Sequence, residues 1–221
     1  MVAFAKIRKA AEKRLGAAEL ERRLPKIKTP AQLKKLGDDR YLSLMELRVF
    51  RAGLKHEMVD AKWPAFEEVF LGFDPRRVRA MSEEAVEKLM GDARLIRHLG
   101  KLKSVQENAA AMCDIAEEHG SFAAWLASWP TAEIVKLWDE LAKRFAQMGG
   151  NSGPYFLRMS GKDTFVPTPF VVKALNHWGA FAGEPKGKAA RAKLQEIFND
   201  WVEETGMPLA HLSMTLAASV D

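Results

Sequence analysis

A glycine-rich bend in the second half of the chain carries residue types that are suited to binding an anion. The stretch from Leu141 to Phe156 reads as a helix, a turn and a second helix, and its turn contains Gly149, Gly150, Asn151, Ser152 and Gly153. Glycine permits positive φ and a close approach of another backbone, and the amides at the start of a helix carry partial positive charge. Such a turn can hold one phosphate without reading a base. The alternative is a plain corner between two helices, in which the glycines only solve the geometry.

The basic residues gather near the start of the chain. Residues 1–40 contain 12 Lys and Arg against 5 Asp and Glu, a net +7, whereas the whole chain has +5, which leaves −2 for the rest. A basic stripe of this kind can hold a polyanion by releasing counterions. The alternative is a solvated helix face with no partner.

Composition excludes several classes of protein. Of the 221 residues, 48% are hydrophobic and 29% are charged, which is ordinary for a folded protein. A single cysteine, Cys113, excludes a disulfide framework and the usual cysteine-rich zinc site. No apolar run is long enough to span a membrane, and the first residues do not read as a signal peptide, so we expect a cytoplasmic address.

The elements that must position the bend are predicted to be helices. Apolar residues recur at helical spacing in nearly every segment, starting with Phe4, Ile7, Ala11 and Leu15, and no convincing alternation with period two occurs. Asp38 or Asp39 is expected to cap a helix that contains Tyr41. The fold class is therefore predicted to be all-α with short connections.

A long run of residues, about half of the chain, forms one recognisable pattern. It is free of gaps from Ala52 to Ala109 and includes Ala52-Gly53-Leu54, Phe73-Asp74-Pro75, Ile96-Arg97-His98, Gly100-Lys101 and Asn108-Ala109. It continues across the bend with Lys143-Arg144, Gly150, Ser152 and Tyr155. This run resembles the 3-methyladenine DNA glycosylase I (Tag) family of the helix-hairpin-helix DNA glycosylase superfamily.

The resemblance implies a fold, a reaction and a partner. The expected fold has two helical lobes with a cleft between them, one formed by residues 40–165 and the other by 1–39 plus 166–221. The expected reaction is hydrolysis of the N-glycosidic bond of alkylated purines such as 3-methyladenine in double-stranded DNA, after the base has left the stack. The family also implies that Leu54 is the wedge that fills the vacated space, although a buried core leucine is the alternative. We expect a monomer that needs no cofactor and contacts no membrane.

The chain also departs from the family pattern. Arg48 stands where family members carry the glutamate that recognises the methylated adenine, and His56 stands where they carry a tryptophan. Their two-cysteine, two-histidine zinc site cannot be built from Cys113, His177 and His211, so we expect no metal. Their N-terminal Tyr-His-Asp-x-Glu-Trp-Gly motif is absent, and Pro169 occupies the position of the superfamily aspartate, which this family also lacks.

Candidate residues for the base pocket and the chemistry follow from these positions. Aromatic walls would come from Tyr41, Phe50, Trp63 and Tyr155, although each of these rings could equally belong to the core. His56 could hydrogen-bond the base or be a surface histidine.

Arg48 would repel a cationic base. It therefore points to phosphate or pairs with an acidic neighbour, or else the substrate is neutral. Glu46 is the first candidate for orienting water, although it lies about 200° around the helix from Arg48. Glu57, Asp60 and Asp163 are the alternatives, and Asp163 could be only a turn residue.

Two other functions remain open at this point. No lysine is placed as a Schiff-base nucleophile, so the predicted enzyme is monofunctional and does not cleave the strand. Because the pocket residues that can be compared have changed, the alternative is a DNA-binding protein of the same fold without activity. A third reading is a helical interaction module that binds no DNA.

Overall fold

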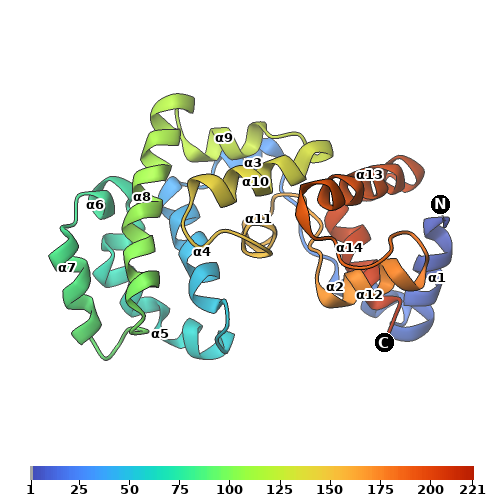
Figure 1. Ribbon diagram of the computed structural model, residues 1–221, viewed down its shortest axis with the longest axis horizontal. Helices are drawn as coiled ribbons and strands as arrows, with labels where there is room; N and C mark the ends of the chain where they lie inside the picture. The colour runs from blue at the N-terminus through green and yellow to red at the C-terminus, as the bar shows by residue number, and fades with distance from the viewer. Residues whose placement is uncertain (1) are drawn as a thin grey trace. The chain divides into compact units, whose positions relative to one another are not determined.

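The computed structural model describes residues 2–221. In this part of the chain, helices joined by turns and loops are the regular secondary structure, and there is no β-strand (Figure 1). The predicted all-α class is therefore confirmed. No helix in residues 2–221 is both long and apolar enough to cross a lipid bilayer.

The chain divides into two compact units. The unit that we call the hairpin unit contains Thr29–Trp129 and Trp138–Ser160, and the terminal unit contains the segment that ends at Lys28, together with Pro130–Leu137 and Gly161–Asp221. These boundaries differ from the predicted lobes of 40–165 and 1–39 plus 166–221, because helix α3 (Pro30–Lys34) packs on α9 (Phe122–Ser128). The Tyr41 hydroxyl also donates a hydrogen bond of 2.9 Å to the Leu33 carbonyl.

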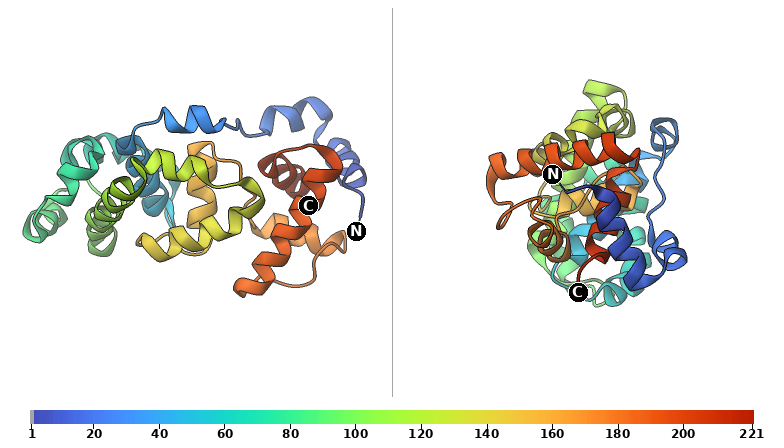
Figure 2. Two further views of the ribbon diagram at one scale, coloured as in Figure 1. Left: turned by 90° about the horizontal axis from the view of Figure 1, so that it is seen from above. Right: turned by 90° about the vertical axis from the view of Figure 1, so that its right-hand side faces the viewer.

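Helix α8 (Leu99–His119) is the central element of the hairpin unit. It packs against α4 (Asp38–Arg51), α6 (Pro75–Arg79), α7 (Glu83–Lys88) and α9, and the ribbons of Figure 2 follow it from two further sides. Its buried stripe includes Leu102, Val105, Ala109 and Met112, the helical spacing of a face that points into a core. Helix α5 (His56–Val69) packs on α4 and on the short 3-10 turn Leu71–Phe73.

The terminal unit has its own apolar core. It contains α1 (Phe4–Leu15), α2 (Ala17–Arg23), α12 (Pro169–His177), α13 (Gly187–Thr205) and α14 (Leu209–Ala218). The rings of Phe165 and Phe198 stack with centroids 4.1 Å apart, and Trp201 lies 5.3 Å from Phe4. The predicted stripe of α1 is buried at Phe4, Ile7 and Ala11.

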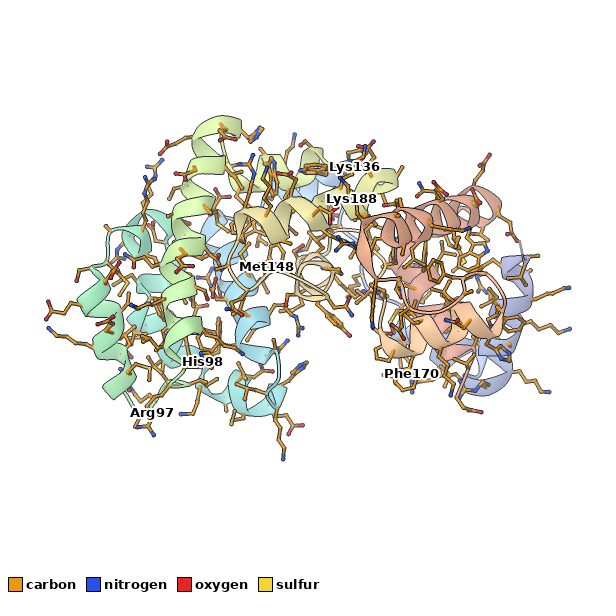
Figure 3. All side chains as sticks on the ribbon, in the orientation of Figure 1. Arg97, His98, Lys136, Met148, Phe170 and Lys188 are labelled. Carbon is orange, nitrogen blue, oxygen red and sulfur yellow. The ribbon has the colours of Figure 1, made fainter. Side chains whose placement is uncertain are left out.

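The predicted bend joins α10 (Ile134–Arg144) to α11 (Ser152–Ser160). Phe145 and Met148 are buried within it, and Figure 3 labels Met148. A Cβ at Gly153 would lie 3.4 Å from the Met148 carbonyl and 3.7 Å from Leu141, which are ordinary contact distances, so the start of α11 lies against the end of α10. Gly150 has φ +59° with open space around it, which identifies it as the position where the chain reverses.

Side chains cap several helices, but the cap predicted for the helix that contains Tyr41 is not found. Asp74 accepts hydrogen bonds from the N–H groups of Arg76 and Arg77 at the start of α6. Gly37, and not an aspartate, precedes α4, which corrects the predicted cap. The Asp38 carboxylate instead accepts from the N–H groups of Phe122 and Ala123 at 2.9 and 3.0 Å, so it caps α9. Two further 3-10 turns occupy Leu89–Gly91 and Thr131–Glu133.

Candidate functional site

A hollow of about 510 Å³ lies in the hairpin unit where α4 turns into α5. Every residue from Arg51 to His56 lines it, together with Arg48 and Tyr155, and we call it the Tyr155 hollow. The Arg48 guanidinium lies over the Tyr155 ring, 4.7 Å from its centroid, which is a cation–π contact. The hollow therefore brings together three of the predicted pocket residues, Arg48, His56 and Tyr155, with the predicted wedge Leu54.

Two interactions hold the turn between α4 and α5 in place. Arg51 makes a double hydrogen bond to Asp60, with Nε–Oδ1 2.8 Å and Nη2–Oδ2 2.6 Å, and thus ties the end of α4 to α5. The buried Lys101 ammonium donates to the carbonyls of Ala52 at 2.7 Å and Phe50 at 3.4 Å. These bonds satisfy carbonyls at the C-terminus of α4, where a cation is also favoured by the helix dipole.

Leu54 is presented to solvent by this turn. Its side chain is 36% exposed, which contradicts the alternative of a core leucine. Gly53 before it has φ +78°, a conformation that favours glycine. The exposed leucine and the hollow therefore lie side by side on one short turn.

Arg48 has no acidic partner. It is half-buried, and it makes no hydrogen bond or ion pair with any residue in 2–221. Its Nε is buried and unpartnered, and burial lowers the pKa of its guanidinium. The predicted alternative that Arg48 pairs with an acidic neighbour is therefore wrong.

The prediction that Glu46 is catalytic is wrong, because the structure gives this residue a structural role. It is fully buried on α4, where its Oε1 accepts a hydrogen bond of 2.6 Å from the Asn108 amide and its Oε2 has no partner. Burial raises the pKa of Glu46 to about 8, against the smaller opposing effect of the Asn108 amide and the nearby Ser104 hydroxyl. A neutral, fully buried acid cannot take a proton from water at a substrate.

Asn108 links this buried acid to the glycine bend. Its amide nitrogen also donates to the Ala146 carbonyl at 3.2 Å, and its amide oxygen accepts from the Ala146 N–H at 2.7 Å. Helix α8 is thereby joined to α4 and to the first residues of the bend.

Three aromatic residues that were predicted to line the base pocket belong to the core instead. Tyr41 and Phe50 are fully buried, and Tyr41 packs edge-on against Phe122. Trp63 is half-buried, stacks on Phe73 and Phe66, and donates its indole N–H to the Ser43 hydroxyl. None of these rings lines the Tyr155 hollow.

Asp163 is corrected in the same way. Its carboxylate accepts from the N–H groups of Leu209 and Ala210 at 3.1 and 2.9 Å, which caps α14 in the terminal unit. Its predicted alternative role as a turn residue is closer to what the structure shows. Within residues 2–221, no group of three His, Cys, Asp or Glu side chains is placed to hold a metal ion.

The predicted phosphate-binding turn is accessible at its tip. Gly149 and Gly150 are exposed, Asn151 is half-buried, and Ser152 and Gly153 are buried at the start of α11. The Ser152 N–H is used internally, since it donates to the Gly149 carbonyl at 3.1 Å. The Gly150 N–H has no acceptor in the described part of the chain.

Sequence reasoning missed the residues that support the site from behind. The sequence marks Lys101 and Asn108 only through the family resemblance, and nothing in it predicts the hydrogen bonds between Arg51 and Asp60. The available signal was a polar residue on a buried helix face, because Lys101, Ser104 and Asn108 follow the apolar stripe of α8. His98, labelled in Figure 3, caps the same helix by accepting from the Lys101 N–H at 3.3 Å.

The helical fold and the sequence of residues 33–149 are those of a glycosylase family. The methyladenine glycosylase family model matches residues 33–149, more than half of the chain, and the chain belongs to this family.

One curated relative is DNA-3-methyladenine glycosylase 1 of Escherichia coli strain K12, which is 41% identical over 70 residues. That match covers 32% of this chain and only 37% of the relative's length.

Solved structures show the same fold. The 3-methyladenine DNA glycosylase I of Staphylococcus aureus superposes with TM-score 0.53 at 21% identity, covering 69% of this chain and 92% of that one. The 8-oxoguanine DNA glycosylase of Thermotoga maritima gives TM-score 0.58 at 16% identity, covering 96% and 95%. At these identities the likeness concerns the fold alone.

Proposed function

We propose that this protein is a monofunctional DNA glycosylase that hydrolyses the N-glycosidic bond of alkylated purines, such as 3-methyladenine, flipped out of double-stranded DNA. The observation that carries the proposal is the exposed Leu54 beside the Tyr155 hollow. An apolar side chain at this place can replace the stacking that an extruded base loses, while a neighbouring hollow receives the base. Membership in the methyladenine glycosylase family supports the same reaction.

The glycine bend supplies the contact to the DNA backbone in this proposal. The exposed amide of Gly150 and the positive end of α11 suit a phosphate oxygen. The contact is independent of base sequence, as a search for damage requires. The bend is tied to the core through Asn108, which gives it a fixed position relative to the hollow in the same unit.

The hollow favours a mechanism that depends little on an acid or base from the protein. No carboxylate is among the residues that line it, and the predicted carboxylate Asp60 is paired with Arg51. An N3-alkylated adenine is cationic, so its glycosidic bond is already weakened, and orientation and stacking become the main requirements. Tyr155 and His56 are the side chains in the hollow that can stack on or hydrogen-bond a base.

A second candidate function is DNA binding without catalysis. The observation that favours it is the same lack of a carboxylate in the hollow, together with the burial of Glu46. For both candidate functions, we propose that the protein binds DNA as a monomer in the cytoplasm.

Release of a methylated base separates the candidates. Duplex DNA treated with a methylating agent is incubated with the protein, and the free bases are resolved by chromatography, while binding to undamaged duplex is measured in parallel. The glycosylase releases 3-methyladenine above the spontaneous rate. Salt-dependent binding without release of any base supports the inactive protein, and the absence of binding at low salt supports the interaction module and contradicts both.

A further inference from the structure

The Tyr155 hollow is lined by positive charge. Arg48, Arg51 and Lys55 contribute cations, and the lining contains no carboxylate to offset them. Arg51 is neutralised by its double hydrogen bond to Asp60, and Lys55 is exposed to solvent. Arg48 is the cation that is half-buried and has no partner with opposite charge.

A second buried cation reinforces the charge of Arg48. Lys101 is buried, with its ammonium held on the carbonyls of Ala52 and Phe50. Burial is the main cause that lowers the pKa of Lys101, and the positive charge of Arg48 lowers it further. A cationic base that enters the hollow would add a third positive charge where water is partly excluded, and this costs binding energy.

An uncharged base gains from the same arrangement. A guanidinium has five N–H donors and no acceptor. The Nε of Arg48 is buried, so its terminal N–H groups are the donors available to a base in the hollow that Arg48 lines. A purine whose edge carries ring nitrogens or an oxygen with lone pairs, and no charge, can accept from Arg48. It can do so while it lies against the pair formed by Arg48 and Tyr155.

A fixed cation in the hollow also assists the departure of an uncharged base more than the departure of a cationic base. When the C1′–N9 bond of a neutral purine breaks, the electron pair leaves with the base, so negative charge develops on it. A water oxygen then bonds to C1′ and loses a proton to solvent, and the departed base takes up a proton from solvent, so the step needs no acid or base from the hollow. A fixed cation beside the departing base stabilises this developing charge, whereas a cationic base departs neutral and offers no such charge.

We infer that Arg48 makes the Tyr155 hollow selective for alkylated purines that are uncharged, with hydrogen-bond acceptors on their edge, over cationic N-alkylated purines. The inference rests on the proposed glycosylase function and narrows its substrate class, because it ranks uncharged alkylated purines above cationic ones such as 3-methyladenine. Arg48 is the specificity-determining residue, and Tyr155 holds its guanidinium in place.

Two isomeric lesions test the inference directly. Duplex oligonucleotides with a single O6-methylguanine or a single 7-methylguanine differ in charge and hardly in size. Release of each base by the full chain is divided by its spontaneous rate, because the cationic isomer is intrinsically labile. We expect the wild-type protein to favour the uncharged lesion by about tenfold, the effect of one good hydrogen bond to a charged group.

Variants assign the preference to one side chain. Arg48→Gln should lower the ratio of the two rates by about tenfold, Arg48→Lys should retain part of the preference because it keeps the charge, and Lys103→Gln should leave the ratio unchanged. Lys103 is the matched control because it lies on α8, pairs with Glu87 at 2.7 Å and does not line the hollow. Circular dichroism of each variant establishes that it is folded.

Each outcome decides the matter. Preferential release of 7-methylguanine by the wild type, with no release of the uncharged isomer, overturns the inference and leaves the glycosylase function standing. An unchanged ratio in folded Arg48→Gln overturns the role of Arg48. If neither isomer nor 3-methyladenine is released while the DNA is bound, the proposed function itself fails, and the inference fails with it.

Discussion

At the scale of single residues, helix α4 has two opposite chemical faces. Glu46 and Arg48 are two positions apart, so they project about 200° from each other, and the sequence alone predicts that they do not share a site. The structure shows that Glu46 faces the core and Arg48 lines the Tyr155 hollow. The sequence could not tell which of the two faces is buried, because both carry a charged residue among apolar ones.

The buried Glu46 makes stability depend on pH. Burial raises its pKa from 4.5 to about 8, so the folded state keeps a proton that the unfolded state releases between these values. This stabilisation is fully present below pH 4.5 and is lost as the pH rises to about 8. It amounts to a free energy on the order of 5 kcal/mol. Chemical denaturation across this range is the measurement.

Substitution assigns the effect. Glu46→Gln keeps the shape without a titrating proton, so we expect a much flatter dependence of the unfolding free energy on pH and a more stable variant above pH 8. Glu196→Gln is the control, because Glu196 is an exposed carboxylate on α13 and does not contribute to the pKa shift of Glu46. Equal slopes for the wild type and Glu46→Gln would show that Glu46 is not the titrating group.

Leu54 is a second residue whose role can be separated from stability. Because its side chain is 36% exposed, Leu54→Ala should change the unfolding free energy by about 0.5 kcal/mol or less. We expect base release to fall by about tenfold, since the vacated space in the stack is no longer filled. Fluorescence of 2-aminopurine placed beside the lesion reports extrusion. Met58→Ala is the control, being 42% exposed on α5 and outside the hollow, and an equal loss in both variants would contradict the wedge.

At the scale of elements, periodicity predicted the helices and the glycine bend, but not the walls of the site. The bend is confirmed because glycines and the change from one apolar stripe to the next mark it locally. Tyr41, Phe50 and Trp63 were misplaced for a different reason, since an aromatic ring in an apolar stripe looks the same whether it faces a core or a pocket. Only tertiary packing, with Phe66 and Phe73 stacked on Trp63, separates the two.

The contact between α8 and the glycine bend is an element-scale prediction. Asn108→Ala removes two hydrogen bonds to Ala146 and the one to Glu46, in a fully buried place. We expect a loss of about 2–3 kcal/mol in unfolding free energy and faster amide hydrogen exchange over residues 145–151. The matched control is Gln106→Ala on the same helix, whose amide donates to the Met81 carbonyl in a loop elsewhere. Unchanged exchange in the bend of Asn108→Ala would contradict this coupling.

At the scale of the whole molecule, charge is distributed unequally along the chain. The N-terminal excess predicted from the sequence is found on α1 of the terminal unit, where Lys6, Lys9 and Lys13 are exposed at helical spacing. None of the three forms an ion pair with a residue in 2–221, whereas Lys88, Lys103 and Lys136 are each paired with a glutamate. A cation that is already paired has less to offer a phosphate.

This difference predicts how DNA binding responds to salt. Each lysine that contacts a phosphate contributes about 0.9 to the slope of log affinity against log salt, because it releases condensed counterions. The triple variant K6Q/K9Q/K13Q should therefore reduce the magnitude of this slope by up to about 2.7, which is about 0.9 for each lysine. K88Q/K103Q/K136Q removes the same net charge and should lower it by much less. Fluorescence anisotropy with undamaged duplex at several salt concentrations measures both slopes. Equal slopes for the two triple variants would mean that net charge, and not a stripe on α1, attracts the DNA.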